Sequence, residues 1–472
     1  MNQPKALKIC FLTEMWERFG LYAMQSLLVF YLIHKMSFAD TDAYMLLGQF
    51  TALLYMGPVV GGWAADRILG NRFAILLGGL LLSVGYALLA LQHHTLFLGL
   101  SLVIVGNSLL KPNISSFLGQ FYQEKDRRRE AGFTLFYMGI NIGVLLATFS
   151  TGYIQEYFGW TACFSASCIA LLLGASIFRS GYRYFEEKGF PPVSHISTLP
   201  VFLRQRPSLI IWFFVAVTLI YFSMTSVGFG SYGLTVFGLL FCGYVISLSL
   251  KTDRIARRRM LALLVLFFII IVFWGLWFEM FFAVNVFVDR AVNRELWGHI
   301  IPTPAFVGLD SLFVLILGPI LATLWKSGKV KLSVPAKFAL GIFILTAGMQ
   351  ILAWSVSWSA VMLPMIWMVL FYFLVTLGEM LISPIGLSMV TEYSPAEHSS
   401  LMMGGFFMSI GFGGKVSGIL AQFASVPEGI TDLGSLNIIY RHAFQEYVWI
   451  GLVVFLVSLA CVPWLKKWLN NS

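Results

Sequence analysis

The chain consists mainly of long apolar runs, most of them about 20 residues or longer, separated by short polar segments. A helix needs roughly 20 mostly apolar residues to cross a hydrocarbon core about 30 Å thick, because no backbone polar group can stay unpaired there. Hydrophobic residues make up 58% of the 472 positions, and charged residues make up only 11%. The sequence therefore predicts an all-α polytopic membrane protein.

The apolar runs form three groups along the chain. They lie at about 5–34, 43–66, 72–92, 95–122, 130–156 and 160–180, then at 209–227 and 231–250, and finally at 260–288, 305–325, 335–356, 360–393, 399–424 and 444–465. We expect an N-terminal six-helix bundle in 1–180, a linker with two additional transmembrane helices in 181–259, and a C-terminal six-helix bundle in 260–472. Two six-helix halves are typical of the major facilitator fold, whose substrate site lies near the midplane between the halves. The expected total is about 14 transmembrane helices.

The net charge of +9 does not indicate a nucleic-acid partner, because the basic residues occur in short clusters between apolar runs. Lys and Arg accumulate in the cytoplasmic loops of membrane proteins. With the N-terminus inside, the cytoplasmic loops hold 24 of the 31 basic residues, and the outer loops hold Lys35, Arg290, Arg294 and Arg441. We therefore expect both termini to lie in the cytoplasm.

The sequence contains no pattern that indicates a cofactor or an enzyme. The five cysteines lie in or at the ends of apolar runs without CxxC spacing, which is typical of packing residues. The chain has no HExxH or GxSxG motif, and its seven histidines do not show the spacing of metal ligands. The run Gly228–Gly233 fits GxGxxG but joins two apolar helices, so it predicts a helix-hairpin turn.

We single out seven charged residues inside the apolar runs, where each costs at least ~2.5 kcal/mol and is by default a functional hypothesis. They are Glu14, Glu17, Arg18, Lys111, Glu279, Glu379 and Lys415. With a rise of 1.5 Å per residue, Glu14, Lys111 and Glu379 each lie about 15–20 Å from the cytoplasmic ends of their helices. We therefore expect the three to lie at one level in the membrane.

The first-helix charges Glu14, Glu17 and Arg18 are spaced i, i+3 and i+4, which places them on one helix face. A carboxylate in such a cluster can exchange a proton for a salt-bridge partner, which is what proton coupling requires. Static salt bridges between helices are the alternative. Glu279 and Lys415 lie deeper toward the outer side, where they either pair at a gate or Lys415 extends to the interface.

Five segments carry a resemblance to one family. The run Glu14–Phe19 reads EMWERF and resembles the ExxERF signature of the proton-dependent oligopeptide transporter family. Residues 61–67, 110–115, 136–143 and 379–388 resemble the loop after the family's second helix and parts of its fourth, fifth and tenth helices. The similarity covers nearly the whole chain, and the two extra helices are similar to those of the bacterial members.

The resemblance implies a proton-coupled symporter for short peptides, driven by the proton gradient, in the cytoplasmic (inner) membrane and functional as a monomer. By resemblance, Glu14, Glu17, Arg18 and Glu279 serve proton coupling. The residues that would bind the peptide are Arg18, Tyr22, Tyr55, Lys111, Asn141, Asp310, Glu379 and Phe406. Cation and carboxylate clusters on opposite sides are complementary to a zwitterion.

The chain also departs from the family pattern. Gln25 stands where a basic residue is usual, Asp310 replaces an Asn, and Phe406 replaces a Trp. We therefore expect a gate that involves Gln25, Glu279 and Lys415, with Lys415 supplying the positive charge. Asp310 adds an acidic group near the peptide amino end, which suggests a preference for cationic peptides. The alternatives are a symporter of this fold for a non-peptide or modified amino-acid substrate, a solute receptor and an intramembrane enzyme.

Overall fold

The computed structural model describes residues 3–91, 93–123, 126, 128–191, 201, 207–326, 332–358 and 361–470. Ten ranges among these residues are long and apolar enough to cross a membrane. Two of them, Asp40–Ala90 and Arg128–Tyr184, have 51 and 57 residues, enough for two crossings each. The charge-bearing helices α1 (Lys5–Phe30) and α14 (Ser399–Leu420) lie outside the ten ranges. The helices are consistent with the expected count of about 14.

The chain divides into two compact units. Unit 1 comprises Met1–Leu28 and Leu53–Val227, and unit 2 comprises Val29–Ala52 and Gly228–Ser472. The start of the second helix thus belongs to unit 2, and the two additional helices are divided between the units. The three-part division into 1–180, 181–259 and 260–472 stays a prediction about how the chain is organised.

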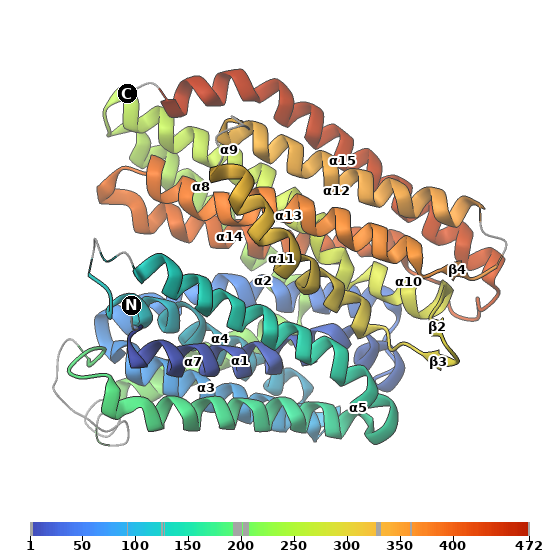
Figure 1. Cartoon of the computed structure of the whole chain (residues 1–472), viewed down its shortest axis with the longest axis horizontal. Helices are drawn as coiled ribbons and strands as arrows, with labels where there is room; N and C mark the ends of the chain where they lie inside the picture. Colours follow the sequence, from blue (N-terminus) through green and yellow to red (C-terminus); the bar gives the residue numbers. More distant parts are fainter. Residues whose placement is uncertain are drawn as a thin grey trace. The chain divides into compact units, whose positions relative to one another are not determined.

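The first half of the chain is helical almost throughout (Figure 1). After α1 come η1 (Tyr31–Lys35), α2 (Asp40–Ala64), η2 (Ala65–Leu69), α3 (Gly70–Ala90), η3 (His93–Thr95), α4 (Leu96–Gly119), α5 (Arg128–Ser180), η4 (Gly181–Tyr184) and α7 (Pro207–Thr225). Inside α5, Gly159 has a φ of 80°. Only glycine adopts this conformation readily, so the helix breaks between the two runs that the sequence separates at 156 and 160.

Helices α3 and α4 pack along a line of glycines. A Cβ atom on Gly78 would lie 2.7 Å from the Gly106 carbonyl oxygen, and one on Gly106 would lie 2.8 Å from the Gly78 carbonyl oxygen. Gly85 and Gly99 approach each other in the same way, with 2.9 Å from a Gly85 Cβ to the Gly99 carbonyl oxygen. Small residues let two membrane helices approach this closely, since lipid supplies no hydrophobic force between them.

Replacing Gly106 with Ala is expected to lower the free energy of unfolding by about 1–3 kcal/mol, because the added methyl group meets backbone and not a movable side chain. The thermal midpoint of the purified protein in detergent measures this loss. Gly119→Ala in the same helix is the matched control, because its Cβ would meet only the Phe133 ring at 3.8 Å. Equal midpoints for the two variants would contradict the packing described here.

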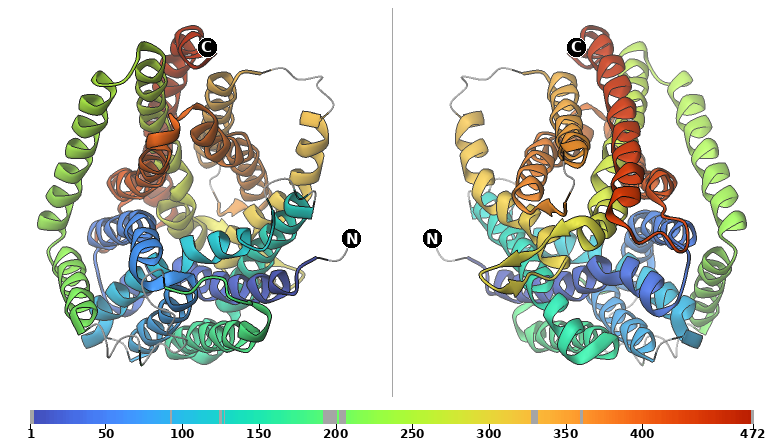
Figure 2. Two further views of the ribbon diagram at one scale, coloured as in Figure 1. Left: turned by 90° about the vertical axis from the view of Figure 1, so that its left-hand side faces the viewer. Right: turned by 90° about the vertical axis from the view of Figure 1, so that its right-hand side faces the viewer.

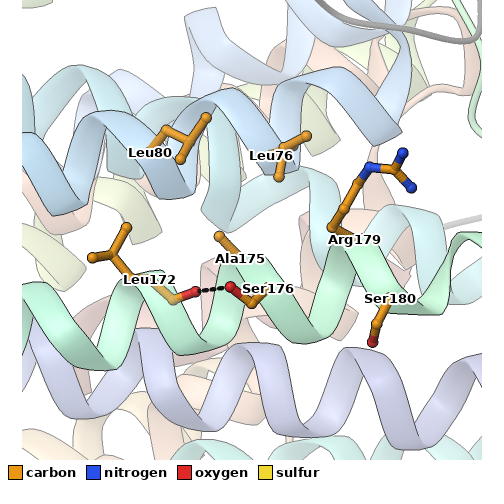
Figure 3. A pocket seen from close by; sticks show the side chains of 7 residues that line it. All are labelled: Leu76, Leu80, Leu172, Ala175, Ser176, Arg179 and Ser180. Carbon is orange, nitrogen blue, oxygen red and sulfur yellow. Dashed lines mark hydrogen bonds between the residues drawn. The ribbon is translucent and has the colours of Figure 1, made fainter.

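A groove lies between α3 and the end of α5 (Figure 3). Leu76 and Leu80 of α3 and Leu172 of α5 form its apolar walls, and Arg179 of α5 extends toward α3.

The chain after α5 folds back onto the start of α3, where Arg72 Nε donates a hydrogen bond to the Lys188 carbonyl oxygen at 2.6 Å. These contacts fix the first part of the predicted linker to unit 1.

The second half of the chain begins with the other additional helix. Its elements are α8 (Val227–Leu250), α9 (Arg254–Trp277), η5 (Phe278–Phe281), α10 (Ala283–Ala291), β1 (Val292–Asn293), β2 (Glu295–Leu296), β3 (His299–Ile300), α11 (Pro304–Lys326), α12 (Val334–Trp358), β4 (Leu363–Pro364), α13 (Ile366–Tyr393), η6 (Ala396–His398), α14, η7 (Ala421–Ala424) and α15 (Leu433–Asn470). Helix α12 lies beside both α13 and α15 (Figures 1 and 2).

Three features differ from the sequence prediction. Short strands occur, with β1 parallel to β4 and β2 antiparallel to β3. The β2–β3 turn has Trp297 and Gly298 at φ 51° and 79°, as two-residue hairpins require. Helix α15 begins at Leu433 and not near 444, because hydropathy detects only the apolar part of a helix. The run Gly228–Gly233 lies inside α8, and the break between α7 and α8 is at Ser226.

Candidate functional site

The three charges of α1 are almost completely buried in unit 1. Glu14 is 0% exposed, Glu17 is 1% and Arg18 is 4%. Arg18 Nη2 donates to Glu17 Oε1 at 2.6 Å, and its Nε donates to Glu17 Oε2. This two-bond contact is the strong form of an arginine–carboxylate pair, so Arg18 neutralises Glu17 directly.

Lys111 of α4 completes the cluster. Its Nζ lies 2.8 Å from Glu14 Oε1, and Arg18 Nε lies 3.6 Å from the same oxygen. Two carboxylates therefore face two cations, with no net charge. The Lys111 side chain is 33% exposed, whereas that of Glu14 is 1% exposed. Lys111 is thus much more exposed than the carboxylate that it contacts.

Asn107 supports this cluster and was missed by the sequence reasoning. It lies four residues before Lys111 in α4, and its Oδ1 accepts from Arg18 Nη2 at 3.5 Å. Its Nδ2 donates to the Leu54 carbonyl oxygen of α2 at 2.9 Å, which orients the amide. A polar residue one turn from an intramembrane lysine is the signal that marks Asn107 in the sequence.

The other predicted polar positions of unit 1 lie on α1 and α5. Asn141 is 5% exposed and donates to the Tyr137 carbonyl oxygen at 3.0 Å. It is two residues from Gly143, where a Cβ would lie 2.3 Å from the Met15 carbonyl oxygen of α1. Gln25 is completely buried, and neither its amide nitrogen nor its amide oxygen makes a hydrogen bond to any residue that the structure describes. Its role in a gate stays a prediction.

The predicted aromatic positions differ in exposure. Tyr22 and Tyr55 of unit 1 are half-buried. Phe406 of unit 2 is only 2% exposed, and its ring lies 2.5 Å from where a Cβ of Gly386 would be. Phe406 therefore packs against α13 in this conformation and presents no open ring surface. Contact between these rings and a substrate stays a prediction.

Two carboxyl groups come together in unit 2. Asp310 of α11 lies beside Glu379 of α13. Trp277 at the end of α9 donates from Nε1 to Glu379 Oε2 at 3.1 Å. The hydroxyl of Thr376, one turn before Glu379, lies 2.7 Å from Asp310 Oδ1. Trp277 and Thr376 were not predicted as members of the site.

Glu279 and Lys415 have other partners in unit 2 than the pairing we expected. Glu279 of η5 is completely buried, and its Oε1 accepts from Ser417 Oγ at 2.9 Å. Lys415 Nζ donates to the Ser231 carbonyl oxygen at 2.6 Å and to Thr235 Oγ1 at 2.8 Å, both on α8. Successive helix residues are rotated by about 100°, so Lys415 and Ser417 point about 200° apart. Lys415 thus faces α8 while Ser417 faces Glu279.

A buried ion pair that the sequence did not predict ties α2 to α10. Arg290 Nη1 and Nη2 donate to Asp40 Oδ2 and Oδ1 at 2.6 and 2.9 Å. Asp40 Oδ2 also accepts from the backbone N–H of Val426, after η7, at 3.0 Å. Three segments of unit 2 therefore converge on Asp40. Among the described residues, no group of three or more His, Cys, Asp or Glu side chains is arranged to hold a metal ion.

Comparison with known proteins identifies the family to which the chain belongs. The sequence model of the POT family matches residues 72–450. The chain belongs to the POT family. It is therefore a multi-pass membrane transporter and not an enzyme, with the major facilitator fold that the sequence predicts.

The relatives of this POT family member match over nearly their full length. Dipeptide and tripeptide permease A of Yersinia pestis is 30% identical over 97% of this chain and 91% of its own length. Dipeptide and tripeptide permease B of Yersinia enterocolitica is 31% identical over 100% and 97%. A solved peptide transporter POT in complex with sulfate has a TM-score of 0.84 and 28% identity, covering 100% of this chain and 97% of that chain.

Proposed function

We propose that this protein is a proton-coupled symporter that takes up di- and tripeptides by alternating access. The observation that carries the proposal is the buried cluster of Glu14, Glu17, Arg18 and Lys111 in a POT family chain. Relatives named dipeptide and tripeptide permease, which match along nearly the whole chain, support a peptide substrate. An amino group on the substrate is consistent with the Glu379 carboxyl group in unit 2.

In the proposed mechanism, Lys111 changes partner. Protonation of Glu14 removes the charge that holds Lys111 at 2.8 Å, so the ammonium becomes available for the peptide carboxylate. Arg18 assists at the same end of the peptide and remains paired with Glu17 until Glu17 is also protonated. Loss of these protons on the other side of the membrane re-forms the ion pairs and displaces the peptide. Glu279 serves as a further coupling carboxyl group.

The amino end of the peptide is assigned to other side chains. Glu379 accepts the ammonium group, with Asp310 beside it, and Asn141 contributes its amide. Tyr22, Tyr55 and Phe406 shape the space for side chains. Gln25 and Glu279 serve a gate. For Lys415 we propose that it holds α14 against α8, because both of its hydrogen-bond partners are on α8.

We also propose the membrane in which the protein resides and its orientation there. Both termini lie in the cytoplasm, and the protein resides in the cytoplasmic membrane, since most basic residues fall in loops on one side. We propose a functional monomer, as the resemblance to the family implies. One chain of the structural neighbour, tetrameric PepTSo2, matches this chain with a TM-score of 0.85 and 26% identity.

Uptake of labelled dialanine into proteoliposomes tests the proposal. We expect accumulation only with an inward proton gradient, and accumulation in Glu17→Gln reduced to roughly a tenth or less, which corresponds to about 1.4 kcal/mol. Glu186→Gln is the control, because this residue is 73% exposed and outside the membrane helices. If the protein is folded but accumulates no peptide, the fold assignment still holds and the peptide substrate is ruled out.

A further inference from the structure

The groove between α3 and the end of α5 combines apolar walls with a cation at one end (Figure 3). Its volume is about 480 Å³. Leu80 of α3 and Leu172 of α5, which form part of the walls, are exposed, so the groove opens to the outside of unit 1. The proposed transport mechanism uses none of the residues that line it.

Three polar side chains line the groove, and Arg179 is the one with hydrogens left to donate. Ser176 Oγ donates to the Leu172 carbonyl oxygen and Ser180 Oγ to the Ile177 carbonyl oxygen, each at 2.7 Å. A hydroxyl group has one hydrogen, so both serines use theirs within α5. Arg179 is exposed and makes no ion pair with any residue that the structure describes. The groove therefore offers a ligand one positive charge.

An aromatic ring supports the arginine in this position. The Arg179 guanidinium carbon lies 4.7 Å from the centroid of the Tyr182 ring. A guanidinium group on the face of a ring keeps N–H groups for an anion, whereas one that is paired with a carboxylate has used them. Arg72 at the start of α3 differs, because it is buried and donates to the Lys188 carbonyl oxygen. Arg179 is thus the cation that an anion in the groove can contact.

The groove's cation lies at the end of unit 1 where the chain begins. Lys5, the first residue of α1, has its Nζ 5.3 Å from the centroid of the Tyr184 ring, close after Arg179 in the chain. The segment after α5 adds the charged residues Arg183, Glu186, Glu187 and Lys188. Together with Arg72 and Arg179 these make four cations and two acids. This excess of positive charge is complementary to an anionic lipid head group.

The length of the groove suits a lipid within one leaflet. Arg179 and Leu172 are seven residues apart, which is about 10 Å along the helix at 1.5 Å per residue. Half of a hydrocarbon core about 30 Å thick is about 15 Å. A head group at Arg179 would therefore place the first part of an acyl chain against Leu80 and Leu172.

We propose that this groove binds an anionic phospholipid, whose phosphate is held by Arg179 and one of whose acyl chains lies between α3 and α5. The lipid belongs to the leaflet on the side of the chain's N-terminus. A lipid fits better than a soluble anion, because the walls beside the arginine are apolar. This binding does not depend on which solute the protein carries, so its test is independent of the proposed function.

Two photoreactive phospholipids test the site. Both carry a diazirine group in one acyl chain, and they differ in having an anionic phosphoglycerol or a zwitterionic phosphoethanolamine head group. Each is added at a low fraction to phosphatidylcholine nanodiscs that contain the intact protein, and the labelled peptides are identified by mass spectrometry. We expect the groove walls to be labelled about fivefold more by the anionic lipid, the factor for one basic side chain near such a lipid.

An exposed face without a cation is the internal reference. Leu239 and Leu240 of α8 are exposed, and α8 contains no Lys or Arg. Both photoreactive lipids should therefore label these residues equally.

Two arginine variants locate the preference. Arg179→Gln should bring the ratio of the two labels in the groove close to that on α8. Arg183→Gln removes the same charge from the same end of unit 1, but Arg183 lies over the Tyr184 ring at 4.8 Å and does not line the groove. The preference should therefore remain in Arg183→Gln.

Three results would overturn the proposal. The first is equal labelling of the groove by both lipids in the intact protein. The second is a loss of preference in Arg183→Gln as large as in Arg179→Gln, which would mean that only the total charge attracts the lipid. The third is a groove without label beside a labelled α8, which would mean that another protein chain, such as a second copy, covers it. The intact protein gives a decisive result even if a variant does not fold.

Discussion

Replacing Lys111 with Gln is expected to abolish peptide accumulation and to lower the free energy of unfolding by about 3 kcal/mol. Glu14 is completely buried, and its Oε1 is held by Lys111 at 2.8 Å, with Arg18 more distant at 3.6 Å. Without the ammonium group, the carboxylate is a buried charge whose remaining partner, Arg18, is more distant and is shared with Glu17. The peptide carboxylate would also lose its proposed cation. Proteoliposome uptake and thermal unfolding in detergent measure the two effects.

The double variant Glu14→Gln with Lys111→Gln separates stability from transport. Two neutral amides can hydrogen-bond in the same place, so most of the lost stability should return, since replacing both partners of a buried pair is far less costly than removing one. Transport should stay lost, because Glu14 can no longer carry a proton and Lys111 can no longer pair with the peptide carboxylate. Glu186→Gln should change stability by no more than about 0.5 kcal/mol, because its ion pair with Lys188 is exposed.

Two results would argue against this interpretation. Accumulation by Lys111→Gln at the level of the intact protein would mean that Lys111 does not bind the substrate carboxylate. A double variant as unstable as the single one would mean that the loss comes from packing of the lysine stem and not from the unpaired charge.

Asp40→Asn is expected to reduce the free energy of unfolding by about 2 kcal/mol and to slow uptake several-fold. The Asp40 side chain is 5% exposed, accepts from both terminal nitrogens of Arg290, and also accepts from the Val426 N–H. Its loss frees the start of α2, the end of α10 and the segment after η7 from one another. Amide hydrogen exchange should therefore rise in these three segments first.

Exchanging the two charges tests the geometry of this pair. Asp40→Arg combined with Arg290→Asp restores the attraction but leaves the Val426 N–H without its acceptor, because arginine has none. We expect partial recovery of stability, greater than in either single variant and less than the original. Asp42→Asn, an exposed acid in the same first turn of α2, is the control. Similar exchange rates in Asp40→Asn and Asp42→Asn would show that the ion pair does not hold this end together.

The sequence alone predicted those features of the fold and of the site that depend on a single helix. The i, i+3, i+4 spacing placed Glu14, Glu17 and Arg18 on α1, and Gly159 breaks α5 where the apolar runs separate. It was insufficient where two distant segments meet. Asp40 and Arg290 are 250 residues apart, and at the ends of apolar runs such charges are usually solvated. Only burial distinguishes this pair from ordinary loop charges.

The gate residues show a second limit. Depth along a helix follows from counting residues, and this gave Glu279 and Lys415 similar levels. The direction in which a side chain points depends on which neighbour each helix packs against, and the apolar helices here are hydrophobic on every side. Nothing in the sequence specified that Lys415 faces α8, or that Trp277 at the end of α9 meets Glu379.

Because Val29–Ala52 belongs to unit 2, this segment can make its contacts only after much later parts of the chain have been synthesised. Asp40 leaves the ribosome 250 residues before Arg290, which at roughly 5–20 residues per second is about 12–50 s. The interval is longer still between Gly48 and Gly418, which pack closely: a Cβ on Gly48 would lie 2.9 Å from the Gly418 Cα. During this interval the start of α2 is an incomplete surface with an unpaired acid. The ion pair that joins α2 to α10 therefore forms only after most of the chain has been made.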